Sequence, residues 1–133
     1  MTTMRLPQRS AFVVVTLLAA CASLTESTPA GAVRATADAE AVRVTNGTRR
    51  PVFTFVVSRN ALPLILWGPC VDAVRCPPPI APGATRAEPR AQMLLGPDDR
   101  EVVVHWWHAV PGPDGVARPD SIRAFVVALP PAP

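Results

Sequence analysis

The sequence predicts an all-β protein, a small antiparallel β-sandwich of six or seven strands that follows a signal peptide and a flexible tether. Apolar and polar residues alternate with a period of two in several short runs, which is the pattern of strands with one buried face. The chain also contains 17 prolines, most of them between those runs. Proline is tolerated in loops and at sheet edges but costs about 3 kcal/mol inside a helix, so a helical bundle is disfavoured.

Residues 1–20 have the parts of a secretory signal peptide. Arg5 and Arg9 precede a short apolar run over residues 11–18, and small residues follow it. The run is too short to cross a membrane as a mature helix, which needs roughly 20 apolar residues. We therefore expect a cleaved signal and not an element of the fold.

The end of this run carries a motif. Leu18-Ala19-Ala20-Cys21 resembles the bacterial lipobox, the recognition site of the lipoprotein signal peptidase. The resemblance implies that the Cys21 sulfur receives a diacylglyceryl group and that cleavage follows Ala20. Two or more acyl chains hold a protein stably at a bilayer, so membrane lipid bound through Cys21 would anchor the mature chain on the extracytoplasmic side. Ala22 is not the aspartate that retains some lipoproteins at the inner membrane, which favours the outer membrane in a cell that has one.

Residues 21–39 are mostly small and polar, with almost nothing to bury, which predicts a flexible tether. The folded domain is expected over residues 40–130. The formal net charge of +3 loses Arg5 and Arg9 with the signal, leaving about +1 for the mature chain. We see no basic stripe, so nucleic acid is not expected as a partner.

The expected strands are separated by turn signals such as the NGT of residues 46–48. The run over 100–110 is apolar on both faces, which predicts a central strand or one that is covered on both sides. We expect the last strand to meet the second in the core, through Phe125, Val127 and Leu129 on one side and Phe53 and Phe55 on the other. In architecture this plan resembles an immunoglobulin-like or transthyretin-like sandwich. The expected strands cover residues 42–45, 51–58, 62–67, 81–89, 100–110 and 121–129.

Cys70 and Cys76 stand with five residues between them. In an oxidising compartment they should pair, and Cys21 is consumed by lipid, so no free thiol is left over. A disulfide that closes so short a loop stabilises a protein by about 2–3 kcal/mol on the chain-entropy model. A redox pair or a pair of metal ligands is the alternative, but redox pairs favour two intervening residues and the prolines after Cys76 stiffen the loop.

The stretch His105-Trp106-Trp107-His108 is the candidate ligand surface, because tryptophan stacks on ligands and histidine binds metals or protons. On a strand, His105 and His108 point to opposite faces, so one site cannot readily use both. Met93 could join either histidine in a periplasmic copper site, since a thioether suits Cu(I). We favour the alternative, in which the tryptophans pack in the core and no metal is bound.

The sequence shows no catalytic constellation. Ser58, Thr85 and Ser121 lack a second feature that marks a nucleophile, and no Gly-x-Ser-x-Gly motif is present. The acidic residues at 98–101 lie in a turn without the repeating oxygen ligands of a calcium loop. We therefore expect a non-enzymatic envelope lipoprotein that binds or scaffolds an envelope protein or ligand at the membrane, without a cofactor. The alternatives are a periplasmic copper or metal carrier that uses His105 or His108 with Met93, and an enzyme whose residues the sequence does not reveal.

Overall fold

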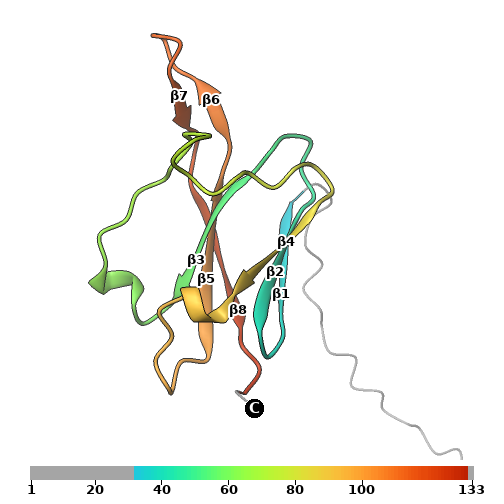
Figure 1. Ribbon diagram of the computed structural model, residues 1–133, viewed down its shortest axis with the longest axis vertical. Coiled ribbons are helices and arrows are strands. Elements are labelled where there is room, and N and C mark those ends of the chain that lie inside the picture. The colour runs from blue at the N-terminus through green and yellow to red at the C-terminus, as the bar shows by residue number, and fades with distance from the viewer. Residues whose placement is uncertain (1–31, 132–133) are drawn as a thin grey trace, which may run out of the picture.

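The computed structural model describes residues 32–131 (Figure 1). The expected signal peptide, the lipobox-like motif with Cys21 and most of the expected tether therefore lie outside the described residues. The described chain is all-β, which confirms the predicted fold class. Its elements are β1 (Val33–Ala37), β2 (Ala41–Asn46), β3 (Phe53–Ser58), β4 (Thr85–Pro89), β5 (Glu101–Trp107), β6 (Ala109–Pro111), β7 (Ala117–Pro119), β8 (Arg123–Ala128) and two single-turn 3₁₀ helices, η1 (Leu62–Leu64) and η2 (Arg90–Gln92).

Two three-stranded antiparallel sheets pack face to face, as Figure 1 shows. One has the order β1-β2-β4 and the other β3-β5-β8, while β6 and β7 form a separate hairpin that extends beyond one end. The outer strands of one sheet lie over the outer strands of the other. At one edge β1 contacts β8, and at the other the Thr54 hydroxyl of β3 donates to Glu88 Oε1 of β4 at 3.1 Å. None of the described residues forms a helix long and apolar enough to cross a membrane.

The main core lies between the two sheets. It consists largely of valines, because alternate positions of each strand face inward and β-branched side chains pack well on a pleated surface. Each fully buried valine contributes about 1.5–3 kcal/mol relative to an exposed one. Its buried members are Val33, Val42, Val44, Val52, Val56, Ile80, Met93, Val102, Val104, Val127 and Leu129.

A second apolar cluster lies on the other face of the β3-β5-β8 sheet. Phe53, Cys76 and Trp107 are its buried members, with Phe55 and Trp67 packed beside them. Apart from Ala109 of β6, the members of this cluster outside the sheet come from residues 61–80, which we call the cover loop. The prediction that the run over 100–110 is covered on both sides is therefore confirmed.

The predicted strand over residues 62–67 is wrong. The segment begins with η1 and continues as an extended loop, with Leu64 and Leu66 exposed. Pro63 has no amide hydrogen to donate to a sheet, and the run is nearly continuous instead of alternating. Apolar character alone therefore does not identify a strand here.

The tether predicted through residue 39 is also wrong over residues 33–37, which form β1. This strand pairs antiparallel with β2, with Ala35 opposite Val44. Val33 is buried in the main core, and the small apolar residues at alternate positions suffice for a strand at the edge of a sheet. The turn to β2 is closed by Asp38, whose Oδ1 accepts from the amide nitrogens of Glu40 at 2.9 Å and Ala41 at 2.8 Å. The folded domain thus begins before residue 40.

The expected contact of the last strand with Phe53 and Phe55 is wrong because of register. On β5, His105 stands opposite Phe55 while the preceding Val104 stands opposite Phe125. Successive residues of a strand point to opposite faces, so Phe55 and Phe125 lie on opposite faces of the sheet. Phe125 packs in the main core together with Val127 and Leu129.

The run over 100–110 is divided in the structure. The strand β5 ends at Trp107, and after His108 the chain continues into β6 and the hairpin with β7. The turn of this hairpin uses Gly115 at a φ of 76°, a left-handed conformation that favours glycine. With this hairpin and β1, residues 32–131 contain eight strands, although residues 62–67 contribute none.

Candidate functional site

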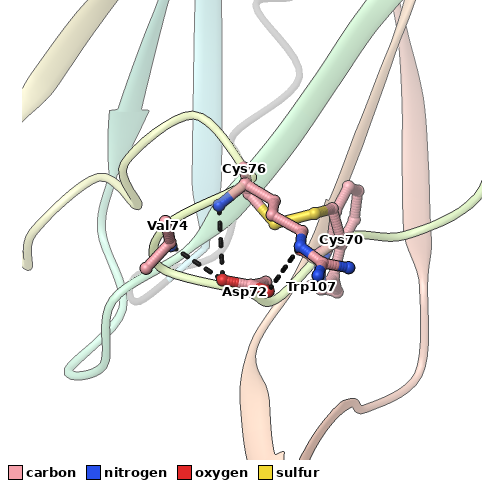
Figure 2. The surroundings of a disulfide bond; sticks show 6 residues. Cys70, Asp72, Val74, Cys76 and Trp107 are labelled. Carbon is pink, nitrogen blue, oxygen red and sulfur yellow. Dashed lines mark hydrogen bonds and ion pairs between the residues drawn. A yellow bond between two sulfur atoms is a disulfide. The ribbon is translucent and has the colours of Figure 1, made fainter.

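Within the cover loop, a disulfide joins Cys70 and Cys76 and closes a short ring, as the sequence predicts (Figure 2). Asp72 shapes the turn between them. Its carbonyl oxygen accepts from the amide of Cys76 at 2.9 Å, and its Oδ1 accepts from the amide of Val74 at 2.8 Å. An aspartate that bonds to the backbone two residues onward is a common way to start a tight turn. The sequence between the cysteines therefore builds the ring that the disulfide locks.

Trp107 connects this ring to the sheet. Its indole nitrogen donates to the carbonyl oxygen of Cys70 at 2.9 Å, and Figure 2 shows the ring beside the disulfide. The Phe53 ring is stacked on it with centroids 6.5 Å apart, and the Trp67 ring centroid lies 6.3 Å away. Only 2% of the Trp107 side chain is exposed. Trp107 is thus a core residue of the second cluster.

The cluster continues under the amino-terminal half of the cover loop. Trp67 stacks on Phe55 with ring centroids 4.7 Å apart and reaches the His105 ring at 4.5 Å. His105 is 7% exposed, and its Nδ1 is buried without a hydrogen-bond partner among the described residues. Burial lowers the pKa of His105, and a backbone group of Phe55 opposes this only in part. The aromatic surroundings therefore disfavour the charged form of the imidazole.

A small cleft of about 100 Å³ opens between the disulfide and this aromatic cluster. Pockets that take whole small molecules measure roughly 300–1,000 Å³, so this cleft suits one apolar side chain or a group of similar size. The phenyl rings, the disulfide and the Trp107 indole give it an apolar wall. Its lining residues are Phe53, Thr54, Phe55, Gly68, Cys70, Cys76, Pro77 and Trp107.

Trp106 lies on the opposite face of the sheet from Trp107 and His105. It is half-buried against the main core, and the Arg123 guanidinium stands 4.6 Å from its ring centroid. This cation–π contact fixes the indole at the edge of the domain. The His-Trp-Trp-His stretch is therefore divided between two faces.

His108 follows the end of β5 and is buried. Its Nδ1 lies 2.9 Å from the carbonyl oxygen of Pro51, which can only accept, so Nδ1 carries the proton. Its backbone amide donates to Asp120 Oδ1 at 2.9 Å. These contacts anchor the start of the β6–β7 hairpin to the sandwich.

The structure does not bring Met93 to either histidine. Met93 is buried between the sheets beside Ser58, whose amide donates to its carbonyl oxygen at 2.7 Å, whereas His105 lies on the other face of that sheet. His108 sits beside Pro51, and the extended chain from there to Ser58 spans about 20 Å. Across residues 32–131, no group of three or more histidine, cysteine, aspartate or glutamate side chains is placed to hold a metal ion.

A polar network that sequence reasoning missed lies at the far end of β3. The Asp99 carboxylate accepts from the hydroxyl of Ser58, the side-chain amide of Asn60 and, at 2.9 Å, the amide of Gly96. The hydrogen bond from Ser58, followed by those from Gly96 and Asn60, lowers the pKa of Asp99. Ser58 is fully buried. Because the Asp99 carboxylate accepts hydrogen bonds from both Asn60 and Gly96, the network connects the loop after β3 to the loop before β5. A serine at a strand end with an aspartate before the partner strand is the only signal in the sequence.

Asn46 organises the NGT turn, which confirms the turn predicted there. Its side-chain amide is buried and donates to the carbonyl oxygens of Arg50 at 2.8 Å and Ile80 at 2.9 Å. Its Oδ1 accepts from the amide and the hydroxyl of Thr48. The amide group is thus satisfied within the fold. Gly47 is required next to it, because a Cβ there would stand 2.3 Å from the carbonyl oxygen of Ala32.

The features that could serve a ligand therefore gather under the cover loop: an apolar cleft, a disulfide rim and an aromatic floor. They define a β-sandwich with one disulfide-capped aromatic face. No family model, no curated protein and no solved structure matches the chain.

Proposed function

We propose that this protein is a lipoprotein of the bacterial cell envelope, anchored through Cys21, whose β-sandwich binds a partner without catalysis. The observation that carries the proposal is the sequence Leu18-Ala19-Ala20-Cys21 at the end of a basic and then apolar amino-terminal segment. The disulfide Cys70–Cys76 supports it, because disulfides persist in oxidising compartments outside the cytoplasm.

The binding role is proposed for the cleft beneath the cover loop. Its walls come from aromatic rings and the disulfide, and its volume of about 100 Å³ suits one apolar side chain of an envelope protein. Buried aromatic pockets of this kind are typical places for the anchoring residue of a protein–protein contact. The rim is held by the bond from Trp107 to Cys70, so the cleft is formed before a partner arrives.

Metabolic labelling with an alkyne fatty acid tests the anchor. The wild-type chain should take the label and fractionate with membranes, and Cys21→Ala should abolish both. The matched control is the double variant Cys70→Ser with Cys76→Ser, which removes the other two cysteines of the sequence and should stay labelled. A Cys21→Ala variant that is labelled as strongly as the wild type would contradict the proposal.

A further inference from the structure

We propose that two copies of this chain pair through β8, so that their β3-β5-β8 sheets join into one continuous antiparallel sheet. The inference concerns the described strands alone and does not depend on the lipid anchor. None of the residues that line the cleft under the cover loop belongs to β8, so the pairing does not use the residues of that site.

The strand β8 has an open edge. It is the last strand of its sheet and pairs with β5 on one side, and none of the described residues pairs with its other side (Figure 1). The amide of Leu129 donates to the carbonyl oxygen of Arg100 at 2.7 Å, in register with the pairing of β8 and β5. Bonded positions alternate along an antiparallel strand, so every second residue before Leu129 also bonds to β5. The backbone N–H and C=O groups of Ala124, Val126 and Ala128 therefore point to the open edge.

This edge lacks the protection that the edge on the other side of the sandwich has. Proteins guard edge strands with prolines, charges or covering segments. On β3, Val52 exchanges backbone hydrogen bonds with Ile80 of the cover loop, and β4 carries Pro89 and the ion pair of Arg86 and Glu88. Residues 124–131 contain no charged side chain, and their prolines come only after β8 has ended. An edge of this kind is a template for pairing with another strand.

The outward face of β8 is also apolar and uncovered. The side chains of Ala124, Val126 and Ala128 are exposed, and Val126 is 47% exposed although Val103, opposite it on β5, is buried. The one charged residue of the strand, Arg123, lies at its start and stacks on Trp106 of the other face. A strand that pairs with β8 would therefore cover apolar surface without burying a charge.

The pattern of β8 selects a second copy as the partner. A two-fold axis perpendicular to the sheet at Val126 places this residue opposite the partner's Val126, and Ala124 opposite the partner's Ala128. All the open-edge residues then exchange hydrogen bonds in pairs, and the exposed valines meet on the same face. A register shifted by two residues would lose one of these pairs.

The same arrangement avoids repulsion between like charges. The two Arg123 side chains stand at opposite ends of the paired strands, about 20 Å apart along the strand direction. This distance exceeds the Debye length of about 8 Å at physiological salt. Between residues 124 and 128, only apolar residues stand opposite one another, so the strand is its own complement.

Oxidative cross-linking of the purified full-length protein tests the pairing and its register. Val126→Cys places two thiols opposite each other in a pair whose Cα atoms are about 5.5 Å apart, which a disulfide can span. Oxidation with copper phenanthroline should give a covalent dimer, and mass spectrometry should show position 126 linked to position 126. Ala124→Cys alone should link at least about ten-fold less, since its copies lie about 14 Å apart, and mixing it with Ala128→Cys should restore the link. Ala87→Cys, an exposed position on β4, is the matched control and should stay monomeric.

A charge at the edge tests the same contact without a cross-link. Val126→Lys sets two ammonium groups opposite each other and should weaken dimerisation at least about ten-fold. Val116→Lys makes the same change at a valine that is 60% exposed in the turn of the β6–β7 hairpin, and it should dimerise like the wild type. Sedimentation of the full-length variants in mild detergent measures the association, and circular dichroism checks that each is folded.

A folded Val126→Cys protein that stays monomeric would overturn the inference. So would equal cross-linking at position 87, or a link from position 126 to Cys21 of the amino-terminal segment or to a different protein. The fatty-acid label on Cys21 plays no part in these measurements. Loss of the label therefore contradicts the lipid anchor alone, and loss of the dimer contradicts the pairing alone.

Discussion

Trp107 joins the β3-β5-β8 sheet to the cover loop. Its ring stacks on Phe53 in the sheet, and its indole nitrogen holds the carbonyl of Cys70 in the cover loop. Trp106, the next residue, faces the other way and is only half-buried. Adjacent and identical side chains therefore make very different contributions to stability.

We expect Trp107→Ala to lower the free energy of unfolding by about 3–5 kcal/mol, because it leaves a cavity and an unpaired Cys70 carbonyl. Trp106→Ala should cost clearly less, since that ring keeps partial contact with solvent. Thermal unfolding of both variants with the disulfide intact measures the difference. If both variants melt within a few degrees of the wild type, Trp107 is not a core residue.

His105 introduces a pH dependence. Burial lowers its pKa below the ordinary value of 6.5, so the unfolded chain takes up a proton more readily than the folded one. Its contribution to stability is complete above about pH 6.5 and is lost as the pH falls toward the lower folded pKa.

His105→Phe should remove this loss, because phenylalanine fits the aromatic surroundings of Phe55 and Trp67 and does not titrate. The melting temperature of the wild type should fall between about pH 7 and pH 5, whereas that of the variant should stay nearly constant. A variant with the same slope as the wild type would show that another group is responsible.

Among the elements, the cover loop depends most on a covalent bond. It contributes no strand, and its contacts with the second cluster pass mainly through Trp67, Cys70 and Cys76, while Ile80 at its end is anchored separately by backbone hydrogen bonds with Val52. The disulfide closes a seven-residue turn, so the chain-entropy model gives it about 2 kcal/mol.

Replacing both Cys70 and Cys76 by serine should therefore lower stability by about 2 kcal/mol and loosen the loop over the aromatic cluster. Denaturant unfolding measures the first effect. Quenching of tryptophan fluorescence by acrylamide measures the second and should increase. Unchanged quenching would mean that the loop stays docked without the bond.

The strand β1 lies where a tether was predicted, and its removal tests the corrected boundary. A chain that begins at residue 40 lacks one of the two strands that pair with β2, and it lacks Val33, which packs in the main core with Val42 and Val44. It should be unfolded or strongly destabilised, whereas a chain that begins at residue 32 should keep a cooperative transition. Circular dichroism of the two truncated chains during unfolding measures the difference. Equal stability of the two chains would show that β1 is not part of the folded domain.

Lowering the pH should reduce the folding stability of the whole molecule in two stages. His105 accounts for the first, below about pH 6.5. The second belongs to Asp38, Asp99 and Asp114, whose pKa values are lowered from 3.8 mainly by hydrogen bonds from backbone amides and from Ser58.

These carboxylates stabilise the folded state above about pH 4, and the stabilisation is lost as the pH falls through their lowered pKa values. Denaturant midpoints measured across the acid range should therefore fall, level off and fall again. His105→Phe should keep only the second decline. A single transition centred near pH 6.5, with no further loss in stronger acid, would contradict the role given to the aspartates.

Local patterns were sufficient for much of this fold. Alternation over 42–45 and 51–58 predicted strands that the structure contains, and the spacing of Cys70 and Cys76 predicted their pairing. The NGT turn at Asn46 was also readable, because short-range hydrogen bonds define it. The lipobox likewise depends on consecutive residues alone, and its role at Cys21 stays a prediction.

Longer-range features were not readable in this way. Residues 33–37, with Val33, Ala35 and Ala37 alternating, form a strand because they pair with the edge of β2. The more apolar run over 62–67 has no strand to pair with and forms η1 and a loop. The cleft needed the cover loop to fold back over β3 and β5, a placement set by the contacts of Trp67 and Trp107.

By itself, the sequence determined the all-β class, the turns and the disulfide, since each follows from the conformational preferences of neighbouring residues or from cysteine chemistry. Only the tertiary structure decided which face of β5 meets the second sheet and which meets the cover loop. Both faces are apolar, with Val102 and Val104 on one and His105 and Trp107 on the other, so the local pattern fits either arrangement. The choice depends on the register with β3 and β8 and on where residues 61–80 can be anchored, which are interactions between residues far apart in the chain.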